Sequence, residues 1–338
     1  MKGKTYIIAE VGVNHNGDIL KAVELINKAK ESGADCVKFQ TFRASKIATS
    51  ISPKAEYQLN VTDKNESQLE MLKKLELTYD DFKFLNSKCK EIKIDFISTP
   101  YSFEDIDFLS TLDVKHIKIA SGQLSELEFI NYACSKKKEI ILSTGMATLS
   151  QVCEAVEVAR SHKIEPIVLQ CTTNYPSRIE DANLLAMKTM KKALKVKIGY
   201  SDHVLNNYAC FSAVALGATV IEKHFTLSKY TPGPDHSCSS EPKEFKELVY
   251  GIRQVEKSIG SSVKNPSISE RKNEYGMKRS LVINSSLEKG DVIQKEHIDF
   301  KRPKNGLDIY YFKEIIGEKL RISIKKDTPL QLKHIDWR

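Results

Sequence analysis

Two histidines follow apolar, β-branched runs in the second half of the chain, and their placement suggests a shared metal ion. His203 follows the run from Val196 to Ser201, and His224 follows the run from Thr219 to Glu222. Runs of this kind are typical of buried parallel strands, and such folds place chemistry just past the strand ends. Two imidazoles from neighbouring strands could bind one divalent ion and leave positions open for water and a substrate oxygen. The alternative is that each ring only caps its strand or bonds a backbone carbonyl.

Two lysines lie inside strongly apolar runs earlier in the chain. Lys38 stands in Cys-Val-Lys-Phe-Gln and Lys118 in His-Ile-Lys-Ile-Ala. An ammonium group in such a place is costly unless it meets an anion. The phosphate or carboxylate of a ligand would supply that anion, with nearby hydroxyls filling its remaining lone pairs. The alternative is a buried ion pair with a protein carboxylate, Glu10 or Glu222.

Eight short β-rich runs recur along the first two thirds of the chain, and amphipathic segments such as Ile19–Ser32 separate them. The runs are Tyr6–Val13, Cys36–Phe42, Asp95–Tyr101, His116–Ser121, Glu139–Thr144, Pro166–Thr172, Lys197–Ser201 and Thr219–Thr226. Eightfold strand–helix alternation predicts an α/β fold, a (β/α)8 TIM barrel. An open doubly wound sheet is the main competitor, but no Gly-x-Gly-x-x-Gly follows the first run.

In such a barrel the C-terminal strand ends form one rim, so residues far apart in the sequence converge there. The predicted rim residues are Glu10, Asn14, His15, Lys38, Gln40, Ser98, Thr99, Lys118, Ser121, Ser143, Thr144, Thr173, Asn174, Tyr175, Ser201, Asp202, His203, Glu222 and His224. Asp202 or Asp235 could be a further metal ligand or could orient a bound water. His15 lies in a predicted turn and could be purely structural.

The rest of the chain divides into a long connection and a C-terminal part. Residues 43–78 form a connection long enough to be a lid or binding loop. A helix is predicted from Pro242 to Ile259, which ends a catalytic domain at 1–259. Residues 260–278 are polar and lack periodicity, so they are predicted to be a linker. Residues 279–338 are predicted to form a small β-rich domain.

Composition narrows the class of protein. The 338 residues are 41% hydrophobic and 28% charged, as in ordinary soluble globular proteins. The seven cysteines include no Cys-x-x-Cys pair, which indicates reduced thiols in the cytoplasm. The net charge of +8 suits an anionic substrate. The sequence lacks the basic stripe interleaved with aromatic residues that would indicate a nucleic-acid-binding protein. No apolar run reaches the roughly 20 residues of a membrane span.

The rim residues stand in words that resemble the sialic acid synthase family, the phosphoenolpyruvate-dependent nonulosonate synthases. The words include Ala-Glu-Val-Gly-Val-Asn-His-Asn-Gly (9–17), Val-Lys-Phe-Gln-Thr (37–41), Ile-Ser-Thr-Pro-Tyr (97–101), Lys-Ile-Ala-Ser-Gly (118–122), Leu-Ser-Thr-Gly-Met (142–146), Gly-Tyr-Ser-Asp-His (199–203), Glu-Lys-His-Phe-Thr (222–226), Pro-Gly-Pro-Asp-His (232–236) and Lys-Arg-Pro-Lys-Asn-Gly (301–306). The resemblance implies a barrel followed by an antifreeze-like (SAF) domain. It also implies a domain-swapped homodimer in which Arg302 reaches the partner's active site.

The resemblance further implies a reaction. Phosphoenolpyruvate and water condense with the open-chain aldehyde of an N-acetylated hexosamine, and phosphate is released. Carbon C3 of the enol attacks the aldehyde, water captures the oxocarbenium at C2, and the adduct expels phosphate. The aldehyde is polarised by a divalent metal, Mn²⁺ or Mg²⁺, on His203 and His224.

The same resemblance assigns roles to individual residues. The implied catalytic residues are Glu10, Lys118, His203 and His224. The implied phosphoenolpyruvate ligands are Lys38, Thr99, Lys118, Ser121, Ser143 and Ser201. The implied sugar-binding residues are Glu10, Gln40, Tyr101, Tyr175, Asp235 and Arg302. Two positions depart from the family's usual words: Gln123 replaces a glutamate, and Lys304 replaces a glycine.

Several functions remain open from the sequence. The first is N-acetylneuraminate synthase acting on N-acetylmannosamine, in a pathway to bacterial surface polysaccharide. The alternative is N,N'-diacetyllegionaminate synthase acting on a 2,4-diacetamido-2,4,6-trideoxymannose, because the loop words Lys-Ala-Glu-Tyr-Gln (54–58) and Glu-Ser-Gln-Leu-Glu-Met (66–71) suit both. A Schiff-base aldolase using Lys118 or Lys38 is a second enzyme class. A non-catalytic carbohydrate- or ice-binding protein is a third possibility.

Overall fold

The structure is a computed structural model that describes residues 3–59, 62–63 and 65–337. The chain forms two compact units, Met1–Gly260 and Ser261–Arg338. Each unit is considered by itself.

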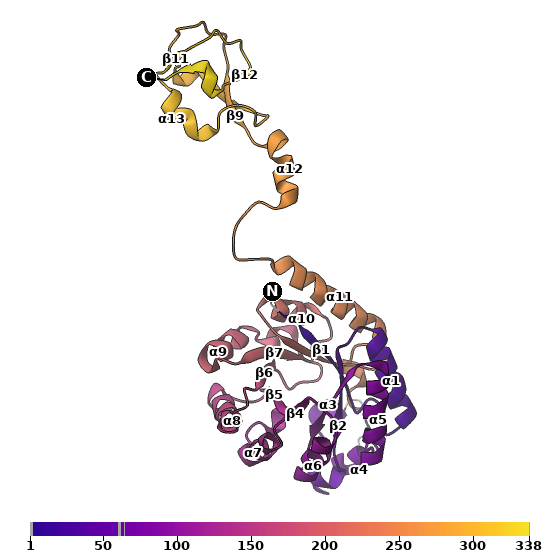
Figure 1. The fold of residues 1–338 in the computed structure, drawn as a ribbon. Helices are drawn as coiled ribbons and strands as arrows, with labels where there is room; N and C mark the ends of the chain where they lie inside the picture. The colour runs from indigo at the N-terminus through magenta and orange to yellow at the C-terminus, as the bar shows by residue number, and fades with distance from the viewer. Residues whose placement is uncertain (1–2, 60–61, 64, 338) are drawn as a thin grey trace. The chain divides into compact units, whose positions relative to one another are not determined.

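The first unit is a parallel β-barrel surrounded by helices (Figure 1). Its strands are β1 (Tyr6–Gly12), β2 (Cys36–Thr41), β3 (Asp95–Pro100), β4 (His116–Ile119), β5 (Glu139–Ser143), β6 (Ile167–Cys171), β7 (Lys197–Asp202) and β8 (Val220–His224). The hydrogen-bonded order is β3-β2-β1-β8-β7-β6-β5-β4, and β4 contacts β3 to complete the ring. The predicted barrel is confirmed, and each predicted run overlaps its strand. The strands were locatable because parallel strands buried on both faces read as continuous apolar runs.

Helices cover the outside of the barrel. They are α1 (Ile19–Glu31), α5 (Tyr79–Ile92), α6 (Phe103–Thr111), α7 (Leu127–Ser135), α8 (Leu149–Ser161), α9 (Leu185–Leu194), α10 (Tyr208–Ala215) and α11 (Pro242–Ile259). Helix α1 begins where predicted, because the Asp18 side chain accepts from the backbone amides of Leu20 and Lys21. Helix α11 has the predicted bounds. Among the described residues, none of the helices combines the length and apolar character needed to span a bilayer.

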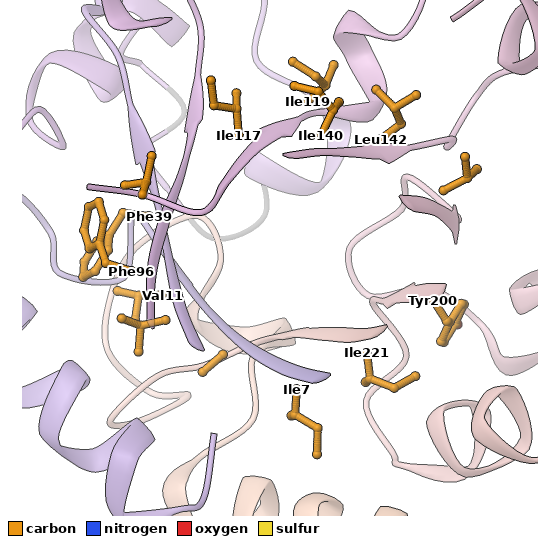
Figure 2. Packing of buried hydrophobic residues seen from close by; sticks show 14 of the residues in the cluster. Ile7, Val11, Phe39, Phe96, Ile117, Ile119, Ile140, Leu142, Tyr200 and Ile221 are labelled. Carbon is orange, nitrogen blue, oxygen red and sulfur yellow. The ribbon is translucent and has the colours of Figure 1, made fainter. Parts of the chain in front are cut away.

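Apolar side chains form two layers because successive strand residues face opposite sides of the sheet. Ile7, Phe39, Tyr200 and Ile221 belong to the large cluster between strands and helices (Figure 2). The second layer fills the inside of the barrel with Ile8, Cys36, Ile97, Ile141, Leu169 and Val220. This inner apolar layer lies below the polar residues at the C-terminal ends of the strands.

The long connection between β2 and α5 contains three short helices. They are α2 (Ala44–Ile47), α3 (Glu56–Leu59) and α4 (Gln68–Lys73). Helix α4 begins with a capping box, in which Ser67 and Glu70 each bond the other's backbone amide. Residues 60, 61 and 64 of the predicted loop lie outside the described residues. Turns and irregular stretches join the three short helices.

The second unit is β-rich, as predicted. Strands β9 (Ser280–Ile283), β10 (Ile298–Lys301) and β12 (Thr328–Pro329) form one antiparallel sheet, and β11 (Lys319–Leu320) pairs with β13 (Ile335–Asp336). A short helix, α13 (Phe312–Ile315), joins them. The unit has its own apolar core, which includes Leu281, Ile283 and Leu330.

The stretch predicted to be a linker, 260–278, is partly helical. It contains helix α12 (Ile268–Met277), which begins at a capping box formed by Ser267 and Glu270. None of its residues is buried. Without a buried face, the helix has no apolar periodicity in the sequence, and its capping box was the only local signal.

Candidate active site

On several strands, the inner face passes from apolar to polar side chains in steps of two residues. On β1, Glu10 follows Ile8, and on β8, Glu222 and His224 follow Val220. The parallel register sets Glu10 beside Lys38 of β2 and beside His224 of β8. The predicted rim is therefore assembled by strand alternation above the inner apolar layer.

An ion cluster occupies the middle of the rim. Lys38 Nζ lies 2.9 Å from Glu10 Oε2 and 3.8 Å from Glu222 Oε1. Lys118 Nζ lies 3.1 Å from Glu222 Oε1, which also accepts from Ser201 Oγ at 2.9 Å. All four charged side chains are buried. The two lysines thus meet protein carboxylates, the arrangement that the sequence analysis kept as an alternative to a ligand anion.

The cluster is not fully satisfied, however. Glu222 Oε2 has no hydrogen-bond partner among the described residues, and Glu10 Oε2 contacts Lys38 without hydrogen-bond alignment. Burial raises the pKa of Glu10 to about 7, against the opposing effect of Lys38. Burial also acts on Glu222, but Lys118 and Lys38 outweigh it and lower the pKa of Glu222 to about 2. The two carboxyl groups are therefore unequal, and only Glu222 is firmly anionic.

Hydroxyl groups gather beside the lysines. Lys38 Nζ donates to Thr99 Oγ1 at 3.2 Å, and Ser121 Oγ accepts from the Gly145 amide at 3.0 Å. A Cβ atom on Gly145 would lie 2.0 Å from Thr173 Oγ1 and 2.8 Å from Ser121 Oγ, so the glycine lets these hydroxyls converge. The buried hydroxyls of Ser143 and Thr173 have no partner among the described residues. Unpaired buried hydroxyls at the same rim as the Lys38 and Lys118 ammonium groups suit a phosphate or carboxylate.

The two predicted metal-binding imidazoles face the same space. The ring centroids of His203 and His224 are 5.4 Å apart. His203 Nδ1 donates to Thr172 O at 2.7 Å, which leaves its Nε2 lone pair free for a ligand. His224 Nδ1 is buried without a hydrogen-bond partner among the described residues. Two buried imidazoles with uncommitted nitrogens fit a divalent metal ion.

The neighbouring acids divide between two roles. Asp235 Oδ2 lies 4.0 Å from His224 Nδ1, and burial raises the pKa of Asp235 to about 6. Asp202, which the sequence analysis offered as a further metal ligand, faces the other way. It pairs with Lys223 at 2.5 Å and accepts from Tyr200 Oη and the Val204 amide. The metal-ligand hypothesis for Asp202 is wrong because adjacent strand residues alternate faces, so Asp202 and His203 diverge.

The predicted sugar-binding residues of the barrel lie around the same mouth. Gln40 Nε2 donates to Glu10 Oε1 at 3.3 Å. The Tyr175 ring lies 4.1 Å from His203 and 5.7 Å from His224, centroid to centroid. Tyr101 is half-buried, and burial raises its pKa to about 12, with Lys38 as the strongest opposing influence. The barrel part of the predicted site is thereby brought together.

The C-terminal prediction concerns a separate unit. Arg302 lies there, and its Nε donates to Met277 O at 3.0 Å. Its contact with a sugar stays a prediction. Lys304 has no positive φ and its amide donates to Tyr275 O, so a lysine fits this loop without left-handed strain. Gln123, the other departure, is buried and its Oε1 has no partner among the described residues.

Two residues of the site received no role from the sequence. Thr173 was placed on the rim, and its convergence with Ser121 on Gly145 became visible only in the fold. Tyr57 belongs to the Lys-Ala-Glu-Tyr-Gln word, and its ring lies 4.9 Å from that of Tyr175. The word was the only signal, because nothing in a loop sequence says which way its aromatic ring points.

Comparisons with known proteins agree with this geometry. The chain matches the NeuB family over residues 25–264 and the SAF domain over residues 278–336. It is 44% identical to the N,N'-diacetyllegionaminic acid synthase of Campylobacter jejuni, covering 96% of this chain and 98% of the relative. It is 41% identical to the enzyme of that name from Legionella pneumophila, covering 98% and 94%.

A solved structure is also similar. The crystal structure of N-acetylneuraminic acid (sialic acid) synthetase from Leptospira borgpetersenii superposes with a TM-score of 0.71 at 31% identity. The match covers 80% of this chain and 90% of that one. The relatives thus include both of the sugar specificities that the sequence left open.

Proposed function

Because the chain belongs to the NeuB family, and is a phosphoenolpyruvate-dependent nonulosonate synthase, we propose that it makes N,N'-diacetyllegionaminate. The acceptor would be a 2,4-diacetamido-2,4,6-trideoxymannose. The observation that carries this choice is the similarity to two relatives named for that product. The chain is 44% and 41% identical to them, over nearly its full length. N-acetylneuraminate synthase, the first preference from the sequence, becomes the second candidate, supported by 31% identity to the Leptospira enzyme.

His203 and His224 would hold the divalent ion, Mn²⁺ or Mg²⁺. When bound, that ion supplies Lewis-acid polarisation of the sugar aldehyde. His224 Nδ1, which is buried and has no hydrogen-bond partner in the described part of the chain, supports this assignment, as does the Nε2 of His203, whose Nδ1 is bonded to Thr172 O. Asp235, close to His224, would accept a hydrogen bond from the sugar or from water.

Lys38 and Lys118 would hold phosphoenolpyruvate, with Thr99, Ser121, Ser143 and Ser201 completing its hydrogen bonds. Contacts with Glu10 and Glu222 keep both ammonium groups in place. An incoming anion would share these cations rather than recruit distant ones, so little reorganisation accompanies binding. As C3 of the enol attacks the aldehyde and phosphate departs, the fixed cations stabilise the negative charge on the leaving group.

Glu10 would lie between the phosphoenolpyruvate-binding and sugar-binding residues. Its carboxyl group contacts Lys38 on one side and Gln40 on the other. It is therefore placed to accept a hydrogen bond from a sugar hydroxyl while Gln40 orients it. This arrangement supports the catalytic and sugar-binding roles expected of Glu10.

The test is phosphate release from phosphoenolpyruvate with each of the two sugars, in the presence of Mn²⁺. We expect a higher kcat/KM with the diacetamido sugar, loss of turnover with EDTA and recovery when metal is restored. A higher kcat/KM with N-acetylmannosamine would make the protein an N-acetylneuraminate synthase. Absence of phosphate release with both sugars would overturn the synthase assignment.

The matched variant is His224→Ala. It should lose turnover by roughly a hundred- to thousandfold while keeping the melting temperature of the parent. Direct Mn²⁺ titration should show weakened binding. Borohydride trapping with a keto substrate checks the Schiff-base aldolase: covalent capture at Lys118 would support that class instead. Unchanged Mn²⁺ affinity in the variant would contradict the shared metal site.

We also infer that the enzyme works as a domain-swapped homodimer in the cytoplasm, with Arg302 serving the partner's site. Subunit mixing tests the swap. Arg302→Ala and His224→Ala proteins are each expected to be impaired, yet a mixed dimer would contain one site with both residues intact. Restored activity on mixing supports the swap. Failure of exchanged dimers to recover activity would mean that Arg302 acts within its own chain or not at all.

A further inference from the structure

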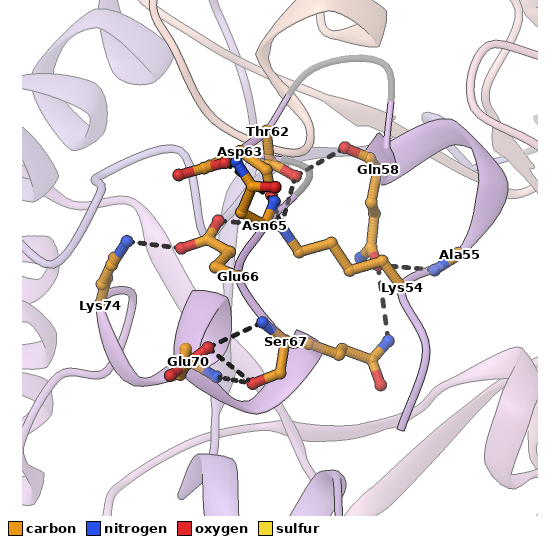
Figure 3. A network of polar contacts seen from close by, with 11 residues as sticks. Lys54, Ala55, Gln58, Thr62, Asp63, Asn65, Glu66, Ser67, Glu70 and Lys74 are labelled. Atoms are coloured by element: carbon orange, nitrogen blue, oxygen red, sulfur yellow. Dashed lines mark hydrogen bonds and ion pairs between the residues drawn. The ribbon is translucent and has the colours of Figure 1, made fainter. Parts of the chain in front are cut away.

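The long connection after β2 is held together by a buried lysine (Figure 3). The Lys54 side chain is 1% exposed, and its Nζ donates to Thr62 Oγ1 at 3.0 Å, Asp63 O at 2.5 Å and Glu66 Oε1 at 2.9 Å. Glu66 also pairs with Lys74 at 2.5 Å. A buried ammonium group with three acceptors has its hydrogen-bonding capacity filled. This cluster therefore serves the shape of the connection and not a ligand.

Helix α3, which begins two residues after Lys54, carries an aromatic ring to the mouth of the barrel. The Tyr57 ring centroid lies 4.9 Å from that of Tyr175, at an interplanar angle of 33°. Gln58 fixes the approach, because its Nε2 donates to Tyr57 Oη at 3.3 Å while its Oε1 accepts from the Ala55 amide at 3.0 Å. Tyr57 is half-buried. The ring is held in place from within the connection.

Tyr57 continues a row of rings that starts at the imidazoles. The Tyr175 ring centroid lies 4.1 Å from that of His203, and the Tyr57 ring centroid lies 4.9 Å from that of Tyr175. Burial raises the pKa of the Tyr57 hydroxyl, with the Asp235 carboxylate as the next contributor, so that hydroxyl is near the acid expected to bind the sugar. A sugar whose aldehyde lies at the two imidazoles would extend along this row, with its far carbons toward Tyr57.

We propose that Tyr57 is a specificity-determining residue that packs against the half of the sugar remote from the aldehyde. This inference rests on the proposed function and deepens it. The two candidate sugars differ in that remote half: one has an acetamido group at C4 and a methyl group at C6, and the other has hydroxyl groups. An aromatic ring gains more from contact with methyl groups than with hydroxyls. The half-buried ring of Tyr57 thus favours the diacetamido sugar.

The test compares Tyr57→Ala with the parent enzyme on both sugars. We expect the KM for the diacetamido sugar to rise roughly tenfold, as for loss of one aromatic contact. The KM for N-acetylmannosamine, the KM for phosphoenolpyruvate and kcat should each change by less than about twofold, because the imidazoles and lysines are untouched. Tyr57→Phe should retain most of the preference, since the ring face remains.

A matched control comes from the same helix. Leu59 is exposed, and Leu59→Ala should leave both KM values and the melting temperature unchanged. An equal change for both sugars, a changed KM for phosphoenolpyruvate, or no change in Tyr57→Ala would overturn the inference while leaving the synthase assignment standing. A parent enzyme inactive with both sugars would overturn the proposed function and this inference together.

Discussion

Strand β8 carries a buried lysine–carboxylate cluster on each of its two faces, and the clusters differ in how completely their polar atoms are paired. On the outer face, Lys223 Nζ contacts Asp202 at 2.5 Å, Val204 O, and Asn206 O at 3.2 Å. On the inner face, Glu222 receives hydrogen bonds on Oε1 alone, and Oε2 has no partner among the described residues. One cluster is closed within the protein, and the other retains capacity for further contacts.

The difference separates structural charge from functional charge. Lys223 and Asp202 join the ends of β7 and β8, next to His203 and His224, so they fix the backbone that presents the imidazoles. The inner cluster leaves acceptor and hydroxyl groups unpaired among the described residues. Buried polar groups with a purely structural role are normally hydrogen-bonded within the protein. The same criterion assigns the fully paired Lys54 to structure. Buried charge alone does not indicate a ligand; incomplete pairing does.

The largest expected effect comes from breaking the outer cluster. Lys223→Met leaves the Asp202 carboxylate buried without its cation, so the free energy of unfolding should fall by about 3–5 kcal/mol. Urea unfolding measures it. The double variant Asp202→Asn with Lys223→Met should recover most of that loss. A variant that kept its stability but lost activity would move Lys223 from the structural to the functional class.

Breaking the inner cluster should have the opposite profile. Lys118→Met should reduce kcat/KM for phosphoenolpyruvate by roughly a hundredfold, since under the proposed function it removes a fixed cation that binds phosphoenolpyruvate. The free energy of unfolding should change by less than about 1 kcal/mol, because Glu222 keeps Lys38 and Ser201. The same two assays apply as for Lys223→Met. Equal stability losses in the two variants would remove the distinction between the faces.

The pH dependence of stability provides a third comparison, because it tests the structural role of the buried His15 ring. Its Nδ1 accepts from the Gly17 amide at 3.0 Å, which is a structural contact, and burial lowers its pKa to about 4. The unfolded chain takes up this proton near pH 6.5, so stability is full above that value and declines as the pH falls toward 4. The loss at pH 5 should be about 2 kcal/mol. Urea unfolding at pH 7 and pH 5 measures it, and His15→Asn should flatten the pH dependence.

The smallest effect is expected at the connection. Lys54→Met removes the three contacts that Lys54 makes with Thr62, Asp63 and Glu66, although Glu66 keeps Lys74. The KM for the sugar should rise about threefold, and amide exchange across 54–59 should become faster, because Tyr57 is less firmly held. Lys73→Met, at an exposed lysine of the same connection, is the control. Faster exchange without a change in KM would separate the connection from sugar binding.

The barrel could be predicted because its signals are local. Each strand is a continuous apolar run, Asp18 caps the first helix, and Glu10, Lys38, His203 and His224 lie where strand ends converge. Helix α12 could not be predicted from periodicity, because it buries no face.

The contact partners and orientations of individual side chains were harder to predict from the sequence. The sequence offered both a ligand anion and a protein carboxylate for Lys38, and only the register of β1 with β2 shows Glu10 at its side. Asp202 and His203 are adjacent in sequence, yet one bonds Lys223 and the other faces the mouth. The position of the Tyr57 ring beside Tyr175 depends on the path of the connection, which no sequence periodicity predicts.

The alternation of Glu222, Lys223 and His224 on β8 also restricts how this enzyme can evolve. Inserting or deleting one residue upstream in the strand would turn Lys223 toward the inside of the barrel and Glu222 and His224 toward the helices. Substitutions can be accepted one at a time, but a change of strand length would exchange scaffold and chemistry in a single event. New sugar preferences should therefore arise by changes in the connections, where length is free to vary, while the strands keep their residue count.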